Sequence, residues 1–86
     1  MLTSLENQLI EILERVLSLN GRSKDFQSQT KLLGSVAELD SLAVAALLSE
    51  IESVFAIRVE DDEIDGAIFA TVKSLSEFID RKLSPK

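Results

Sequence analysis

Apolar residues recur at three- and four-residue steps in three stretches of the chain, and this spacing is typical of amphipathic helices. The first stretch predicts a helix over about Ser4 to Leu19, the second a helix that ends at Phe55, and the third a helix that ends before Pro85. The three stripes are Leu5, Leu9, Ile12, Leu13, Val16 and Leu17; Val44, Leu47, Leu48, Ile51, Val54 and Phe55; and Val72, Leu75, Phe78 or Ile79, and Leu83. Helices with such faces can bury them against one another in a bundle.

Local signals mark two helix starts and one helix end. Thr3 with Glu6 three residues later has the pattern of a capping box, and Thr71 can cap the last helix. Asn20-Gly21 is typical of left-handed residues that stop a helix.

Two further segments connect the helices. The polar stretch that begins at Gly21 is longer than most loops in compact domains, and such loops usually have a function or pack on their own side chains. Later in the chain, the acids Glu60 to Glu63 precede Ile64, Ile68 and Phe69, which suffice for one short helix. The expected fold class is an all-α four-helix bundle with a long first loop and a short third helix, in a single domain over residues 1–86.

Composition limits the chemistry that the chain can perform. Of its 86 residues, 45% are hydrophobic and 28% charged, as in an ordinary soluble globule. The chain has no Cys, which excludes disulfides, thiolate metal sites and catalytic thiols. It has no His either, which excludes a Ser-His-Asp triad and imidazole ligands. An enzyme would have to use carboxylates, Lys and hydroxyls alone, so we expect none.

Negative charge is concentrated in the middle of the chain. The net charge is −6, and the segment from Glu38 to Asp65 holds nine acids against the single base Arg58. This charge argues against nucleic acid or an anionic membrane as partner and favours a basic protein. No apolar run approaches the roughly 20 residues of a membrane span, so we expect no membrane insertion. The N-terminus shows no secretory signal, and the expected location is cytoplasmic.

Asp40-Ser41-Leu42 stands where the long loop meets the second helix. The simplest interpretation is that Asp40 or Ser41 caps this helix. The functional interpretation is that Ser41 offers a surface hydroxyl for modification, because a phosphate ester there would meet free N–H groups and the positive end of the helix dipole. Without a His, nothing in the chain can activate this hydroxyl, so another enzyme would have to supply the base.

The surroundings of this tripeptide resemble the acyl carrier proteins, in which the Ser of an Asp-Ser-Leu motif opens the second helix. The resemblance covers nearly the whole chain and rests on Glu38-Leu39-Asp40-Ser41-Leu42, on Leu47, Ile51, Glu52 and Phe55, on the acids from Glu60 to Asp65, and on Thr71-Val72 with Leu75. The Gly-Gly-x-Ser pattern of peptidyl carriers is absent. The resemblance implies that Ser41 bears 4′-phosphopantetheine, whose thiol holds acyl or related groups as thioesters.

The resemblance also implies partners and further site residues. The partners are a phosphopantetheinyl transferase (a holo-acyl-carrier-protein synthase), an acyl-loading ligase or synthase, and acyltransferases. The carrier itself is expected to be a monomer. Asp40 would orient the helix start and contact the transferase, and Leu42 would dock at the partner surface. The candidates for an interior that admits the acyl chain are Leu47, Leu48, Ile51, Ile64 and Ile68.

The chain departs from the family pattern at three positions. Glu38 stands where many members have Gly, and Ala43 and Ala46 stand where many have acids on the exposed face of the second helix. Acids follow later, at Glu50 and Glu52. We therefore expect Ala43, Ala46, Glu50 and Glu52 to meet partners of a specialised pathway rather than those of bulk fatty-acid synthesis. The alternative is a small acidic helical interaction module without covalent cargo.

The acidic segment also resembles part of a calcium-binding loop. Asp61, Glu63, Asp65 and Gly66 occupy positions 1, 3, 5 and 6 of that pattern. Position 12 should be a bidentate Glu, and Val72 stands there instead. We therefore expect a solvated acidic face that binds divalent ions weakly, and no specific metal site.

Overall fold

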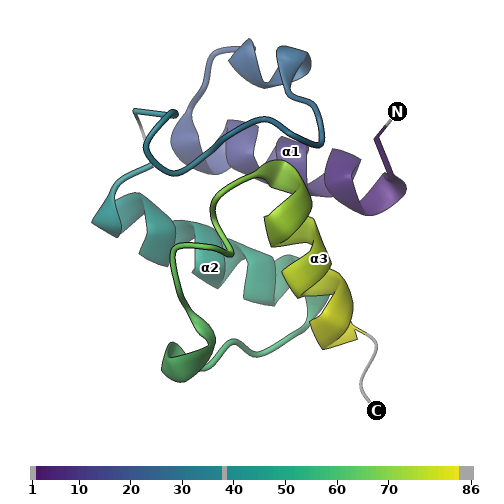
Figure 1. The fold of residues 1–86 in the computed structure, drawn as a ribbon, viewed down its shortest axis with the longest axis vertical. Coiled ribbons are helices and arrows are strands. Elements are labelled where there is room, and N and C mark those ends of the chain that lie inside the picture. The colour runs from purple at the N-terminus through teal and green to yellow at the C-terminus, as the bar shows by residue number, and fades with distance from the viewer. Residues whose placement is uncertain (1, 38, 84–86) are drawn as a thin grey trace.

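The structure is a computed structural model that describes residues 2–37 and 39–83 (Figure 1). These residues form three α-helices and two 3₁₀ turns, namely α1 (Ser4–Leu17), η1 (Arg22–Asp25), α2 (Ser41–Phe55), η2 (Asp61–Glu63) and α3 (Val72–Leu83). They contain no strand, only one isolated bridge between Lys31 and Thr71. None of their helices is both long and apolar enough to cross a bilayer. The predicted all-α class is confirmed, while Glu38 and Pro85 lie outside the described residues.

The first helix starts where predicted and ends two residues early. Thr3 Oγ1 accepts the Glu6 N–H at 3.0 Å and Glu6 Oε1 accepts the Thr3 N–H at 2.9 Å, which completes the capping box. The helix stops when Ser18 takes a left-handed conformation with a φ of 53°. The predicted end at Leu19 is thus wrong, because the early turn buries Leu19 in the core instead of continuing the helix.

The caps of the other two helices are those predicted. Asp40 Oδ1 accepts the Ala43 N–H at 2.9 Å, so Asp40 caps α2. Thr71 Oγ1 accepts the Ser74 N–H at 3.0 Å, while Ser74 Oγ accepts the Thr71 N–H at 3.0 Å. Each pair satisfies a backbone donor that the helix itself leaves without an acceptor.

The expected short third helix is only a 3₁₀ turn, η2. From there to α3 the chain runs in turns closed by hydrogen bonds such as Ile68 N–H to Asp65 O and Phe69 N–H to Gly66 O, both at 3.2 Å. Ile68 and Phe69 are buried without a helix, since the turns already direct both side chains into the core. We call residues 56–71 the strap, which descends from α2 to η2 and returns in front of α2 to α3 (Figure 1).

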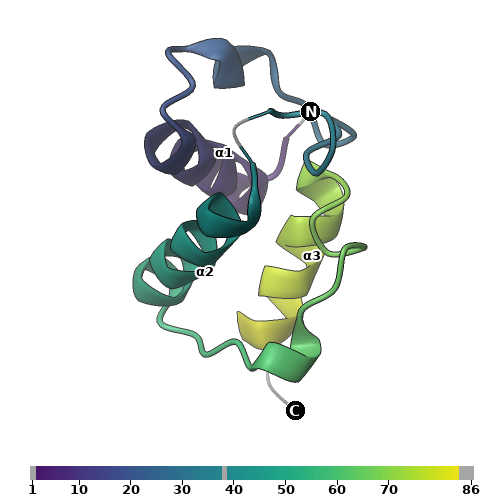
Figure 2. The same ribbon diagram turned by 90° about the vertical axis from the view of Figure 1, so that its left-hand side faces the viewer.

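One hydrophobic core joins all parts of the described chain. Its buried members are Leu9, Ile10, Ile12, Leu13, Leu17, Leu19, Leu32, Leu39, Leu47, Ile51, Ile68, Phe69, Val72, Leu75, Phe78 and Ile79. In the described residues, α1 packs closely on both α2 and α3, while the backbones of α2 and α3 come less close to each other (Figure 2). Val54 and Leu83, both in the last turn of their helices, are exposed rather than part of the predicted stripes.

Two carboxylates of α1 hold the ordered part of the long loop. Glu14 accepts the Gly21 N–H at 3.0 Å and the Ser23 hydroxyl, and Glu6 accepts the hydroxyl of Ser28. The Ser28 hydroxyl and the Thr3 N–H lower the pKa of the buried Glu6. The Gly21 N–H and the Ser23 hydroxyl do the same to the pKa of Glu14. In both cases the hydrogen bonds favour the charged form of the carboxylate.

These two lowered pKa values predict that the protein loses stability in acid. Stability from a lowered pKa is complete above the ordinary Glu pKa of 4.5 and is lost as the pH falls through the folded value. Glu6→Gln should lower the free energy of unfolding at pH 7 by about 1 kcal/mol. As the pH falls from about 5 to 3, the free energy of unfolding should also decrease less steeply in this variant than in the unaltered protein. Urea unfolding across this pH range measures both effects.

Glu11→Gln is the matched control, because Glu11 is exposed on the same helix and its side chain makes no hydrogen bond or ion pair with the described residues. If the free energy of unfolding falls equally steeply with pH in Glu6→Gln and in the unaltered protein, Glu6 does not hold the loop through its charge.

Candidate functional site

Ser41 is the first residue of α2 and is exposed at the left end of that helix in Figure 1. The side chain of Asp40 accepts the Ala43 N–H, and its carbonyl oxygen accepts the Val44 N–H at 2.8 Å. The next residue, Leu42, is 82% exposed. The capped helix start therefore presents the Ser41 hydroxyl outward from an ordered backbone.

The start of α2 fits a phosphate ester on Ser41 Oγ. Among the described residues, none accepts the N–H groups of Ser41 and Leu42, because the Asp40 side chain takes that of Ala43. These free donors and the helix dipole give the helix start partial positive charge. The chain has no His that could deprotonate the hydroxyl, so the base must come from another protein.

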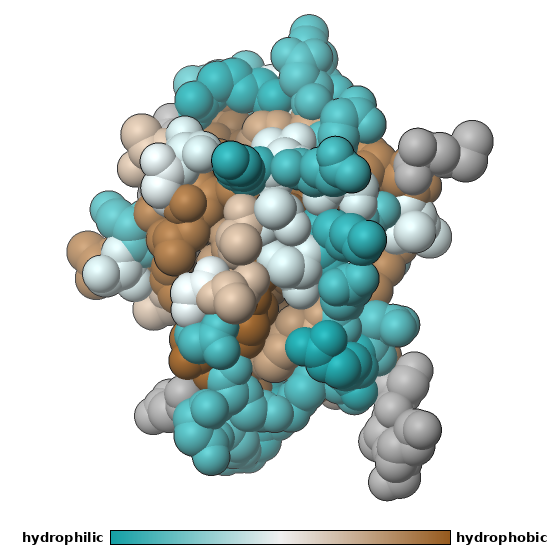
Figure 3. Space-filling view, in the orientation of Figure 1, coloured by the Kyte–Doolittle hydropathy of each residue, from teal (hydrophilic) through white to brown (hydrophobic). Residues whose placement is uncertain are grey.

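The outward face of α2 carries no charge. Successive helical residues are about 100° apart, and the exposed residues Leu42, Ala45, Ala46, Ser49 and Ser53 fall within one sector of the helix. Figure 3 shows a different side of the molecule, on which the strap crosses in front of α2; its centre is mostly neutral and apolar, and hydrophilic side chains gather at the top, right and bottom.

Ala43 is not part of that outward face. It is half-buried and packs against the core, one helical turn before the buried Leu47. The prediction that Ala43 and Ala46 share an exposed face is therefore wrong for Ala43, and Ala45 takes its place beside Ala46.

The two acids expected to meet partners are engaged within the fold. Glu50 forms an ion pair with Arg15 of α1. Glu52 Oε2 accepts the Val59 N–H at 2.7 Å, which attaches the first part of the strap to α2. Both carboxylates stabilise the fold, so they are less available to a partner than the sequence suggests.

The five candidates for an acyl interior all lie in the core or pack against it. Leu47, Ile51 and Ile68 are buried, and Leu48 and Ile64 are partly buried against them. They come from α2 and from the strap, which crosses in front of α2 in Figure 1.

An open groove of about 480 Å³ lies at the end of α2 and is lined by Glu52, Ile57, Arg58, Val59 and Glu60, none of which is among these five candidates. Of these, only Glu52 was predicted as a site residue. The alternation of Ile57 and Val59 with charged neighbours was the one available signal, and two apolar positions are too few to use.

In the segment that resembles a calcium-binding loop, Glu63 and Asp65 make hydrogen bonds within the fold. Lys82 donates to both oxygens of Glu63, and the N–H of Glu60 and this ammonium lower the pKa of Glu63. Asp65 Oδ1 accepts the Ala67 N–H at 2.8 Å. Val72, at the position of the bidentate ligand, is buried in the core. In the part of the chain that the structure describes, no three acidic side chains are grouped to hold a metal ion.

Comparison with known proteins agrees with this geometry. A family model described as the phosphopantetheine attachment site matches residues 7–79. Among solved structures, the chain is similar to a holo acyl carrier protein from Nitrosomonas europaea determined by solution NMR, with 38% identity over 98% of this chain and 100% of that chain, and a TM-score of 0.88. The comparison with curated proteins gives no match. Both likenesses span the start of α2.

We expect Ca²⁺ to bind only weakly at residues 61–66. Glu63 is paired with Lys82, and Val72 offers no ligand oxygen from its side chain. Calorimetry at physiological salt should show weak binding that decreases further as the salt concentration rises. Saturable, tight binding that Asp65→Asn abolishes would contradict this expectation.

Proposed function

The chain belongs to the family of proteins with a phosphopantetheine attachment site and is an acyl carrier protein, and we propose that the hydroxyl of Ser41 is the attachment point. An acyl carrier protein is a carrier and not an enzyme, and its prosthetic group is 4′-phosphopantetheine. When bound, this group supplies a terminal thiol that holds an acyl group as a thioester. The chain has no Cys, so that thiol would be the only one in the protein.

One observation carries the assignment of Ser41: an exposed serine at the capped, positively polarised start of α2. Ser4 is also exposed, at the capped start of α1, but it lies outside residues 7–79, which the family model matches. Several other serines have different surroundings. The hydroxyls of Ser23, Ser28, Ser74 and Ser76 donate hydrogen bonds within the fold. Ser49 and Ser53 are exposed but lie within α2, where the backbone N–H groups are already bonded.

A phosphopantetheinyl transferase would supply the chemistry that the chain lacks. Ser41 Oγ would bond to the phosphorus that carries pantetheine in coenzyme A, and the bond from that phosphorus to the bridging oxygen of the diphosphate would break. Adenosine 3′,5′-bisphosphate would leave, and the transferase would take the hydroxyl proton. Asp40 keeps the helix start ordered through its cap while leaving the Ser41 hydroxyl exposed. Leu42, at 82% exposure, is the apolar side chain that a docked enzyme covers.

The neutral outward face of α2 supports a specialised pathway over bulk fatty-acid synthesis. A basic partner whose surface is complementary to acids early in α2 would lose roughly 0.2–1 kcal/mol of binding free energy for each missing exposed ion pair. Ala45 and Ala46 offer it no charge, and Glu50 is paired with Arg15. A dedicated partner would instead lay apolar side chains over Leu42 and the two alanines.

We expect one pantetheine mass to be added to the protein, at Ser41. The test is incubation with coenzyme A, Mg²⁺ and broad-specificity transferases, followed by intact-mass measurement. Ser41→Ala should abolish the addition, because Ser41 stands at a helix start within residues 7–79, which the family model matches, whereas the exposed Ser4 at the start of α1 lies outside that range. The matched control is Ser49→Ala, which removes an exposed hydroxyl two turns further along α2 and should leave the addition unchanged. An unmodified wild-type protein with several transferases would favour the interaction module without cargo.

We also expect the neutral face of α2 to limit turnover by general fatty-acid-synthesis enzymes. Ala46→Glu adds an acid on this face, and it should raise the apparent affinity of such enzymes for the loaded protein by about two- to fivefold. Gln8→Glu adds the same charge to an exposed position of α1 and is the control. If the unaltered protein already matches a housekeeping carrier and Ala46→Glu gains nothing, the specialised pathway is wrong.

A further inference from the structure

The strap forms one wall of the apolar interior. In the described residues, α2 and α3 both pack closely on α1, and their backbones come less close to each other. Ile68 and Phe69 of the strap belong to the same core as Ile51 of α2 and Ile79 of α3. Displacing the strap would therefore open the core beside α2 without separating the helices from α1.

The end of the strap near α3 is held by backbone hydrogen bonds to the long loop. The N–H of Leu32 donates to the carbonyl of Ala70 at 2.9 Å, and the N–H of Leu33 donates to that of Phe69 at 3.0 Å. These bonds join two ordered backbones, and the core residue Leu32 lies beside them. This end is the fixed end.

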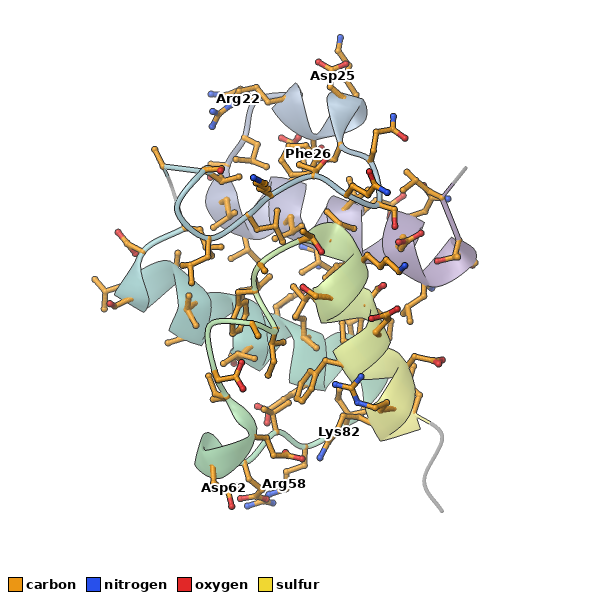
Figure 4. The ribbon with its side chains drawn as sticks, viewed as in Figure 1. Arg22, Asp25, Phe26, Arg58, Asp62 and Lys82 are labelled. Carbon is orange, nitrogen blue, oxygen red and sulfur yellow. The ribbon has the colours of Figure 1, made fainter. Side chains whose placement is uncertain are left out.

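The middle of the strap, at η2, is held to α3 by side chains instead of backbone hydrogen bonds. Lys82 Nζ lies 2.9 and 2.8 Å from the two oxygens of Glu63, and in Figure 4 Lys82 reaches from α3 toward the lower part of the strap. Among the described side chains, this ion pair is the one polar contact between residues 60–67 and any helix.

The Glu63–Lys82 pair is also more shielded than its neighbour on the strap. The side chains of Lys82 and Glu63 are 24% and 32% exposed, against 86% and 61% for Arg58 and Glu60. An ion pair shielded from water is less screened and contributes more than an exposed pair.

We propose that the Glu63–Lys82 ion pair keeps the strap closed, and that breaking it opens the middle of the strap at η2, while Glu52 holds the first part through Val59 and the backbone bonds of Leu32 and Leu33 hold the end near α3. Opening uncovers Ile64 and exposes the core to which Ile51 belongs and against which Leu48 packs. The opening itself is independent of the proposed function. Its use, admission of an apolar chain carried on Ser41, rests on that function.

Hydrogen exchange of the unmodified, full-length protein tests the proposal. In Lys82→Met, which keeps most of the apolar stem, the amides of Glu63 and Ile68 should exchange about fivefold faster than in the unaltered protein. Glu63→Gln, which can still accept the Glu60 N–H, should give the same local result. The amides of Leu32, Leu33 and α1 should keep their rates, because exchange reports local opening separately from global unfolding.

Arg58→Met is the matched control, since it breaks an exposed ion pair on the same strap and should leave these rates unchanged. The proposal is overturned if Lys82→Met and Glu63→Gln behave like Arg58→Met, or if they accelerate exchange equally in α1. The same measurement in a Ser41→Ala background, which on the proposed function carries no prosthetic group, should repeat the result. The outcome therefore stands whether or not Ser41 proves to be the attachment point.

Discussion

The apolar face of α1 is the surface on which the rest of the protein is assembled. Leu9, Ile12, Leu13 and Leu17 are buried on this face, and α2 and α3 each pack closely on α1. Burying one such side chain contributes about 1.5–3 kcal/mol, more than a typical exposed ion pair. With no disulfide to connect its parts, the chain depends on this shared apolar contact to keep α2 and α3 together.

Carboxylates then position the segments that are not helical. Glu6 and Glu14 of α1 hold the long loop, Glu52 of α2 holds the first residues of the strap, and Glu63 joins the strap to α3. Part of the net charge of −6 therefore stabilises the fold and is not free for partners. The strong acidity of the middle of the chain thus has a structural origin as well as an effect on partner choice.

The division of α2 into a buried and an exposed side accounts for the carrier function. Leu47 and Ile51 attach the helix to the core, while Leu42 and Ser41 remain exposed at its start. A carrier needs an accessible hydroxyl on a stable support, and the transferase supplies the base. The absence of His and Cys is thus compatible with the function, because the chain performs no catalysis itself.

The sequence alone was sufficient to predict the helices, their caps and the candidate modified serine, because these depend on residues three or four positions apart. It could not give the end of α1, the reduction of the third helix to a single turn, or the burial of Ala43. Each of these depends on which side of a segment meets the core, and periodicity indicates that a buried side exists but not where its edge lies. The pairs Arg15–Glu50 and Glu63–Lys82 join residues 35 and 19 positions apart. Only the packing of α2, α3 and the strap around α1 brings such distant charges together, so the tertiary structure alone decided which acids support the fold and which remain free.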